Sequence, residues 1–454
     1  MLTSSKELIM KSKIIILSIL AFISINIFGQ SKPTLAHPEW SKKSVIYEVN
    51  VRQYTPEGTF AAFEKHLPEL KALGVDILWL MPINPIGKLN RKGFLGSYYS
   101  VSDYKAVNPE FGTLADFKRL VQKIHNMNMH IIIDWVANHT AWDNVWLKDH
   151  RDFFTKDSYG NLVAPVADWA DVVDLNYDNK ELWNYMIDAM AYWIKECDID
   201  GFRCDVAAMI PTEFWLEAYP RLSKIKKVFI LAEANENYLH KVFDMTYNWQ
   251  LKDLMNQIAS GKKKAVDLIE FFEKEKKEYK PDDFRMNFTS NHDENSWNGT
   301  EFERLGEGTT AFAVLCELIP GMPLIYTGQE AGMNKRLRFF DKDTVIWKPY
   351  KMRNIYTQLN HLKKSNQALW NGLNGGEIKS IDSGNENVYA FTREKNGNKI
   401  FAVFNFSAAE QKVKFSSNAI SGKYKDVFKN GSSTSITNFF ESQLKPWEYK
   451  VFSK

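Results

Sequence analysis

Polar side chains follow four apolar segments of this chain, each at the point where the segment ends. The segments 131–136, 201–206, 229–232 and 286–289 deliver Asp134, Asn138 and His139, then Arg203 and Asp205, then Glu233, and then Asn291, His292 and Asp293. In a parallel barrel the carboxyl ends of the strands lie together and build the active site, so we expect these side chains to converge. Carboxylates in such a cluster can transfer protons and act as nucleophiles. A single strand-end carboxylate is more often a salt bridge or a helix cap, but four consecutive cases indicate a catalytic site.

The residues around Asp205 and Glu233 predict different protonation states for the two carboxyl groups. Arg203 precedes Asp205 by two residues on the same strand, so both side chains point to one face, and the guanidinium should favour the ionised carboxylate. Glu233 follows the apolar segment 229–232, which should exclude water, raise its pKa and keep it protonated as a general acid. The alternatives are a structural ion pair for Arg203 and Asp205, and a strand-end glutamate paired with an arginine for Glu233.

Strand-like and helix-like segments alternate along most of the chain, which predicts a parallel sheet of the α/β class. The expected strands are residues 44–51, 77–80, 131–136, 202–206, 229–232, 286–289 and 324–326, and the expected helices include 60–73, 114–124, 181–194 and 214–222. The helix 60–73 should stop at Gly74.

Two regions depart from this alternation and define the expected domains. Residues 140–178 form an aromatic and acidic stretch without helical period, which is too long for an ordinary loop and predicts an inserted subdomain. From about residue 366 to 454, short alternating strands separated by Asn-Gly and Gly-Asn turns predict an all-β sandwich. Residues 30–139 and 179–365 would then form the barrel.

The N-terminal residues have the layout of a secretory signal. Lys11 and Lys13 precede an apolar run at residues 14–28, and Gly29 follows it. The run is interrupted by polar residues and is short for a membrane span, which needs roughly 20 apolar residues. We expect a signal peptide at 1–29, a secreted or periplasmic location, and no stable membrane span after cleavage. An uncleaved anchor is the alternative.

Charge and cysteine usage exclude other classes of protein. The formal net charge is only +3, and the Lys and Arg residues are scattered, so we expect no nucleic-acid partner. Cys197, Cys204 and Cys316 are odd in number and far apart, which predicts buried thiols rather than a disulfide framework or a metal cluster.

The strand-end motifs together resemble the signature regions of the α-amylase family of glycoside hydrolases. The four main segments are Asp134-Trp-Val-Ala-Asn-His139, Gly201-Phe-Arg-Cys-Asp205, Glu233 within Leu-Ala-Glu-Ala, and Phe288-Thr-Ser-Asn-His-Asp293. Supporting segments occur in family order from residue 40 almost to the C-terminus, among them the one that contains Tyr99. The resemblance implies a (β/α)8 TIM barrel with an inserted subdomain after the third strand and a C-terminal β-sandwich.

The resemblance also implies a role for each site residue. Asp205 would be the nucleophile, Glu233 the acid/base, and Asp293 the group that binds sugar hydroxyls and stabilises the transition state. The implied substrate-binding residues are Arg203, His139, His292 and Tyr99, with Trp142, Trp169 and Trp297 as outer sugar platforms or, equally, as core residues. The implied partner is an α-glucan or a maltooligosaccharide.

Several positions depart from the family pattern. Many α-amylases carry Lys-His shortly after the nucleophile, where this chain has Ala208 and Met209. Val206 is more typical of relatives that act on α-1,6 links, so the linkage stays open. Asn138, Asp168 and Asp171 are weak candidate calcium ligands, but the usual site looks incomplete without the histidine. We expect no required cofactor, with calcium as the alternative.

These observations predict a retaining enzyme that hydrolyses α-1,4-glucosidic bonds of starch or maltodextrin. The alternatives on the same fold are an oligo-1,6-glucosidase, a neopullulanase, a cyclomaltodextrinase-like enzyme or a transglycosidase. A non-enzymatic glucan-binding protein is a further alternative. The presence of all three carboxylates, Asp205, Glu233 and Asp293, favours an enzyme.

Overall fold

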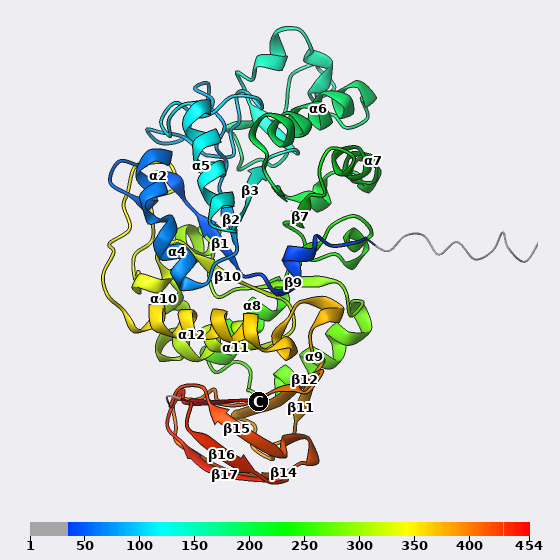
Figure 1. Ribbon diagram of the computed structural model, residues 1–454. Coiled ribbons are helices and arrows are strands. Elements are labelled where there is room, and N and C mark those ends of the chain that lie inside the picture. The colour runs from blue at the N-terminus through cyan, green and yellow to red at the C-terminus, as the bar shows by residue number, and fades with distance from the viewer. Residues whose placement is uncertain (1–34, 430) are drawn as a thin grey trace, which may run out of the picture. The chain divides into compact units, whose positions relative to one another are not determined.

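A closed barrel of eight parallel strands forms the centre of the computed structural model, which describes residues 35–429 and 431–454 (Figure 1). In order around the barrel the strands are β1 (Ile46–Val49), β2 (Ile77–Leu80), β3 (His130–Trp135), β6 (Gly201–Cys204), β7 (Phe229–Ala232), β8 (Met245–Tyr247), β9 (Phe284–Asn287) and β10 (Met322–Tyr326). Ile46 of β1 pairs with Ile77 of β2 and with Leu324 of β10, which closes the sheet.

Side chains of the barrel strands alternate between the inside and the outside, because successive residues of a strand point to opposite faces. In β2, Ile77 and Trp79 belong to the cluster that fills the barrel, whereas Leu78 and Leu80 belong to the cluster under the outer helices. Both faces are buried, which explains why most of these strands read as continuous apolar runs.

Helices surround the barrel (Figure 1). They are α2 (Val51–Tyr54), α3 (Phe60–Phe63), α4 (Leu67–Leu73), α5 (Leu114–Asn126), α6 (Lys180–Cys197), α7 (Thr212–Ser223), α8 (Trp249–Ala259), α9 (Asp267–Glu278), α10 (Glu301–Leu305), α11 (Thr309–Leu318) and α12 (Lys351–Ser365). The single helix expected at 60–73 is divided by a tight turn at Glu64–His66, and Pro68 lies in the first turn of α4, where its missing N–H costs nothing. Gly74 ends α4 in the left-handed conformation, with φ of 94°.

A long segment without helical period leaves the barrel after β3. Its ends are joined by the antiparallel pair β4 (His139–Ala141) and β5 (Val172–Asp174), in which His139 lies opposite Asp174. This pairing fixes the base of the inserted segment beside the carboxyl end of the barrel.

The C-terminal part of the chain is all-β. Its strands are β11 (Ile378–Ile381), β12 (Val388–Lys395), β13 (Asn398–Asn405), β14 (Gln411–Ser416), β15 (Gly422–Asp426), β16 (Ser433–Ile436), β17 (Phe439–Leu444) and β18 (Tyr449–Ser453). Six of them form one antiparallel sheet, and the β14–β17 pair packs on it through a shared apolar cluster. The barrel, the insertion and this domain confirm the predicted fold class.

The C-terminal sheet packs against helices of the barrel, as Figure 1 shows for β11 and β12 below α9 and α11. Phe312 of α11 stacks on Phe406 with ring centroids 4.5 Å apart. Arg393 of β12 is buried at this junction and donates to the carbonyl oxygens of Gly376, Leu318 and Trp370.

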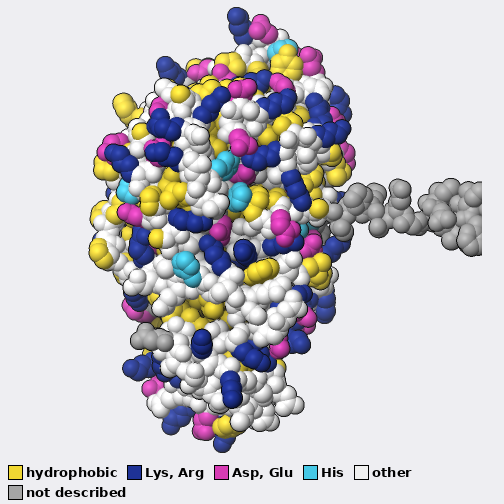
Figure 2. Space-filling view, viewed as in Figure 1, with side chains coloured by type: hydrophobic (Ala, Val, Ile, Leu, Met, Phe, Trp, Pro, Cys, Tyr) yellow, Lys and Arg dark blue, Asp and Glu magenta, His cyan; other side chains and the backbone are white. Residues whose placement is uncertain are grey.

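The predicted signal peptide at 1–29 lies outside the described residues and stays a prediction. Within residues 35–429 and 431–454, we find no helix with the length and apolar character to cross a bilayer. Cys197, Cys204 and Cys316 are buried free thiols, as expected. On the face shown in Figure 2, basic and acidic side chains are interspersed rather than separated into patches of one sign.

Candidate active site

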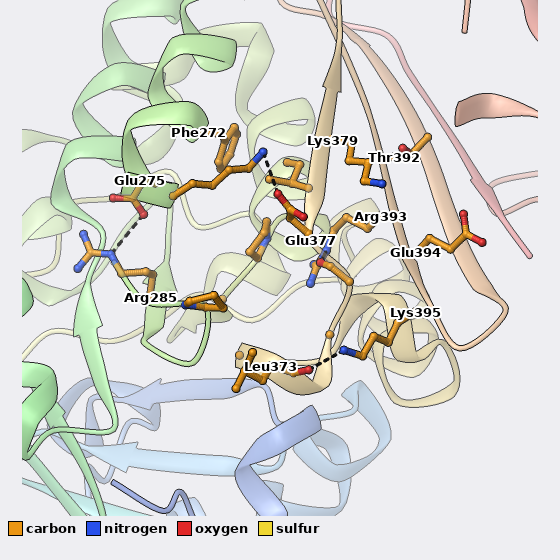
Figure 3. Close-up of a pocket in the computed structure, with 18 of the residues that line it drawn as sticks. Phe272, Glu275, Arg285, Leu373, Glu377, Lys379, Thr392, Arg393, Glu394 and Lys395 are labelled. Carbon is orange, nitrogen blue, oxygen red and sulfur yellow. Dashed lines mark hydrogen bonds and ion pairs between the residues drawn. The ribbon is translucent and has the colours of Figure 1, made fainter. Parts of the chain in front are cut away.

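Two large cavities differ in the chemistry of their walls. The larger, of about 920 Å³, lies where α9, the start of β9 and the strands β11 and β12 meet (Figure 3). Two of its carboxylates are engaged in ion pairs, Glu275 with Arg285 at 3.5 Å and Glu377 with Lys276 at 3.2 Å. The strand-end carboxylates do not line it.

The smaller cavity, of about 570 Å³, lies at the carboxyl end of the barrel and holds most of the predicted site. Asp205, Glu233, Asp293, His139, His292, Tyr99 and Trp297 line it, together with Lys92, Ser97, Asp168, Trp169, Asp171, Val172, Val206, Phe339 and Phe340. Arg203 lies directly beneath, fully buried in β6. This cavity is therefore the candidate active site.

Arg203 is shared by three carboxylates. Its Nη1 atom donates to Asp134 Oδ1 and to Asp205 Oδ1, both at 2.8 Å. Its Nη2 atom lies 2.9 Å from Glu233 Oε2, at an angle outside hydrogen-bond geometry. The single positive charge of Arg203 therefore lies within ion-pair distance of three carboxyl groups, which belong to the neighbouring strands β3, β6 and β7 or follow them directly.

Burial of these carboxylates raises their pKa values. Burial raises the pKa of Glu233 to about 7; Arg203 opposes the rise, whereas the charges of Asp205 and Asp293 add to it. Burial likewise raises the pKa of Asp205 to about 6, against the opposing effect of Arg203. Arg203 contacts Asp205 as expected, but burial, helped by the charge of Asp134, outweighs it and leaves the pKa of Asp205 above the ordinary value. Glu233 still has the higher pKa of the two, as an acid/base paired with a nucleophile requires.

The backbone after Asp205 positions Glu233. Val206 has φ of 36° and ψ of 46°, in the left-handed region that a β-branched residue rarely adopts. In this conformation its N–H donates to Glu233 Oε2 at 2.8 Å, and the N–H of Ala207 donates to the carbonyl of Glu233. Strain of this kind is typical of functional sites.

His292 lies between two carboxylates. Its Nδ1 atom is 2.5 Å from Glu48 Oε1, and its Nε2 atom is 3.3 Å from Asp293 Oδ2. Burial alone would lower the pKa of His292, but Asp293 and Glu48 outweigh burial and hold the pKa well above its usual range. The resulting positive charge in turn holds the pKa of Asp293 below the ordinary value, although burial opposes this. Asp293 is therefore an ionised carboxylate at the opening of the site.

Tyr99 connects this pair to the Arg203 cluster. Its hydroxyl donates to Asp134 Oδ2 at 3.0 Å and accepts from Nε2 of the protonated His292 at 2.7 Å. The Tyr99 and His292 rings are stacked, with centroids 5.4 Å apart. Tyr99 is therefore a mostly buried, fixed ring at the cavity wall, stacked against His292 and Phe339 and with its hydroxyl group fully hydrogen-bonded.

His139 is buried and neutral, since burial lowers its pKa to about 3. Its Nε2 atom lies 3.9 Å from Asp205 Oδ2, and its ring packs against Trp169. A neutral imidazole beside Asp205 can donate a hydrogen bond into the cavity without adding charge.

The tryptophans separate into two groups. Trp169 and Trp297 line the cavity, and Trp297 is about half exposed beside Phe339 and Phe340. Trp142 does not line it; its indole N–H donates to the carbonyl of Ala170, and its ring packs against the apolar core. Trp169 and Trp297 are therefore part of the cavity wall, whereas Trp142 has a packing role.

The candidate calcium ligands do not fit a calcium site. Asp171 pairs with the ammonium group of Lys92 at 3.1 Å, and the same group donates to the carbonyl oxygen of Asp168 at 2.5 Å. The amide nitrogen of Asn138 faces His139 instead of an acidic neighbour. Within the described part of the chain, no group of three or more His, Cys, Asp or Glu side chains is arranged to hold a metal ion. Lys92 already neutralises the charge that a cation would meet.

Several residues of the site were not anticipated from the sequence. Glu48 and Tyr247 are buried in strands, and their partners are His292 and Arg203, which are far away in the chain. Lys92 and Phe340 lie in loops without a local motif. A carboxylate in an otherwise apolar strand, as Glu48 is in Ile46–Val49, is the one signal that could have been noticed.

The chain matches known families along almost its whole described length. Residues 28–166 and 159–379 match the family described as "Alpha amylase, catalytic domain", and residues 378–451 match "Maltogenic Amylase, C-terminal domain".

Similar proteins are named for several activities. "Alpha-amylase 3" of Dictyoglomus thermophilum is 27% identical to this chain, covering 92% of it and 93% of its own length. A "Cyclomaltodextrinase" of Thermoanaerobacter pseudethanolicus is 25% identical, covering 86% and 74%. The crystal structure of a "noncanonic maltogenic alpha-amylase AmyB from Thermotoga neapolitana" is 31% identical, with a TM-score of 0.84, covering 91% of this chain and 99% of that one.

Proposed function

Because this chain belongs to the α-amylase family, we propose that it hydrolyses α-1,4-glucosidic bonds of starch or maltooligosaccharides with retention of anomeric configuration. The main observation in favour of this proposal is that Asp205 and Glu233 contact the two terminal nitrogens of Arg203, at 2.8 and 2.9 Å. Such shared contact favours the separation of about 5–5.5 Å found in retaining enzymes over the roughly 6.5–9.5 Å of inverting ones.

The proposed reaction has two steps. Asp205 attacks the anomeric carbon and forms a glycosyl ester, while Glu233 gives its proton to the departing glycosidic oxygen. Water then attacks the same carbon, Glu233 takes a proton from that water, and Asp205 leaves as a carboxylate. Asp293, kept ionised by the adjacent imidazolium of His292, stabilises the positive charge that develops on the sugar ring.

Retention can be observed directly in fresh digests. Each step inverts the anomeric carbon once, so the first products from amylose or maltoheptaose should be α-anomers. Proton NMR in the first minutes, before mutarotation, measures this. An initial β-anomer would contradict the assigned roles, and glucan binding without cleavage would support a non-enzymatic protein. Pullulan and isomaltose, tested in parallel, distinguish an α-1,6-specific enzyme.

The pH profile should depend on Asp293. The wild-type kcat/KM should follow a bell between the pKa values of about 6 for Asp205 and about 7 for Glu233, because the nucleophile must be ionised and the acid protonated. The charge of Asp293 raises both values. Asp293→Asn should therefore move both limbs of the bell to lower pH, by roughly one unit, besides lowering the rate.

Asp168→Asn provides the matched control for this shift. Asp168 is an exposed carboxylate on the wall of the same cavity, and only its backbone oxygen contacts Lys92. Its charge is screened by solvent, so its removal should leave both limbs in place. A bell that stays in place in Asp293→Asn, or one that moves equally in both variants, would refute the proposed coupling.

A further inference from the structure

One loop spans the cavity between two walls that lie far apart in the sequence. We call residues 87–96, which follow β2, the bridging loop. On one side, Lys92 of this loop reaches the inserted segment after β3, where its ammonium group contacts Asp171 Oδ1 at 3.1 Å and the carbonyl oxygen of Asp168 at 2.5 Å. Lys92 and Asp171 both line the candidate active site.

On its other side the bridging loop is bonded to the loop that follows β10. The N–H of Leu95 donates to the carbonyl of Phe340 at 2.9 Å, and the N–H of Phe94 donates to Asp341 Oδ1 at 3.0 Å. The loop is also braced internally, since Arg91 donates to the carbonyls of Gly87 and Ile86. Three separate segments thus form one continuous wall.

The order of strands places this wall opposite Glu233. The bridging loop follows β2 and its partner loop follows β10, and these two strands flank β1. Glu233 follows β7, which is four strands from β1 in either direction around the barrel of eight. The wall and Glu233 therefore lie on opposite sides of the barrel mouth.

The proposed reaction fixes which end of the bound glucan lies near Glu233. Glu233 protonates the departing oxygen, so the part of the chain that leaves, with its reducing end, lies on the Glu233 side. The sugar attacked by Asp205, and any units that precede it towards the non-reducing end, must extend away from Glu233. They extend towards the bridging loop.

Resting on the proposed function, we propose that the bridging loop, fastened by the Lys92–Asp171 ion pair, closes the non-reducing end of the site. The site then accepts few sugar units before the cleaved bond. The enzyme attacks chain ends and releases short oligosaccharides, and it cuts the interior of long glucans slowly.

The Lys92–Asp171 ion pair is the contact whose removal should loosen the bridging loop. The Asp171 side chain is only 7% exposed and Lys92 is 36% exposed, so loss of the ammonium leaves a mostly buried carboxylate without its cation. The start of the loop is held by the N–H groups of Lys88 and Leu89, which donate to Asp143 Oδ2 at 2.8 and 3.3 Å, and its end is held by the bonds to Phe340 and Asp341. Lys92 is the attachment between these two points. Lys92→Met keeps most of the side-chain volume and removes the charge together with the contacts to Asp171 and to the carbonyl of Asp168.

The test compares two maltoheptaosides, one free and one with its non-reducing end blocked by a 4,6-O-ethylidene group, with products separated by chromatography. Wild type should cleave the free substrate about tenfold faster or more. Lys92→Met should reduce this ratio by several-fold through faster cleavage of the blocked substrate, and Lys92→Arg should retain the wild-type ratio. The rate on the free substrate reports whether each variant is folded.

Lys88→Ala is the matched control, because the exposed Lys88 side chain has no ion pair with any residue in the described ranges, and alanine keeps the backbone N–H that donates to Asp143. It should leave the ratio unchanged. Equal wild-type rates on the two substrates, or a ratio unaffected by Lys92→Met, would overturn the proposed closure alone. Failure of wild type to cleave either substrate would instead refute the proposed function.

Discussion

Glu233→Gln should lower the hydrolysis of maltoheptaose by roughly 10²–10⁴-fold. The amide keeps the shape of the side chain but cannot give a proton to a sugar leaving group, which departs poorly without one. Fluoride needs no such proton, so the variant should still form the glycosyl-enzyme from α-maltosyl fluoride. Stopped-flow release of fluoride and mass spectrometry of the trapped enzyme measure the first step separately from turnover.

Asp205→Asn is the contrasting variant, because loss of the nucleophile should abolish reaction with both substrates. If Glu233→Gln were to lose activity equally on maltoheptaose and on the fluoride, Glu233 would not be the acid. Melting temperatures of both variants should stay near that of wild type, since each substitution keeps the side-chain volume and removes a buried charge.

Arg203→Met should lower the free energy of unfolding by roughly 3–5 kcal/mol, because it leaves Asp134, Asp205 and Glu233 buried without their shared cation. Without that cation the pKa values of all three carboxyl groups should rise further above those of the unfolded chain. A carboxyl whose folded pKa is raised destabilises the protein above that pKa and ceases to do so as pH falls. The loss should therefore be larger at pH 8 than at pH 5, as measured by urea denaturation.

Arg393→Met separates this effect from the loss of a buried arginine in general. Arg393 is equally buried, but it donates to three carbonyl oxygens and pairs with no carboxylate within the described residues. Its removal should destabilise the protein by a similar amount at pH 5 and pH 8. If the loss in free energy of unfolding caused by Arg203→Met did not change with pH, Arg203 would not be the residue that stabilises the three ionised carboxylates.

Most barrel strands were predictable because they are apolar and end in polar motifs. The exception is β8, Met245–Tyr247, which has only three residues and stands between Asp244 and Asn248. So short a segment carries no measurable period. Pairing with β7 and β9 places β8 in the barrel. These pairings join residues of different strands, so the local sequence of β8 does not predict them.

The candidate site was predictable in its parts but not in its electrostatics. The two-residue spacing of Arg203 and Asp205 indicated their contact, which the structure has at 2.8 Å. The same spacing contains no information about Asp134 and Glu233, which reach the guanidinium from the strands on either side. The raised pKa of Asp205 comes first from its burial and then from the charge of Asp134, and both depend on strand neighbours rather than on sequence neighbours.

The left-handed backbone of Val206 implies a conflict between thermal stability and catalytic rate. Holding a β-branched residue there costs on the order of 1–3 kcal/mol, and it aims an N–H at Glu233. Glycine or asparagine at this position would release the strain, but it would also let the peptide rotate away from the carboxylate. Laboratory selection for survival at high temperature alone would therefore favour replacement of Val206, and the survivors would be slow enzymes. Selection for activity at moderate temperature would retain the valine.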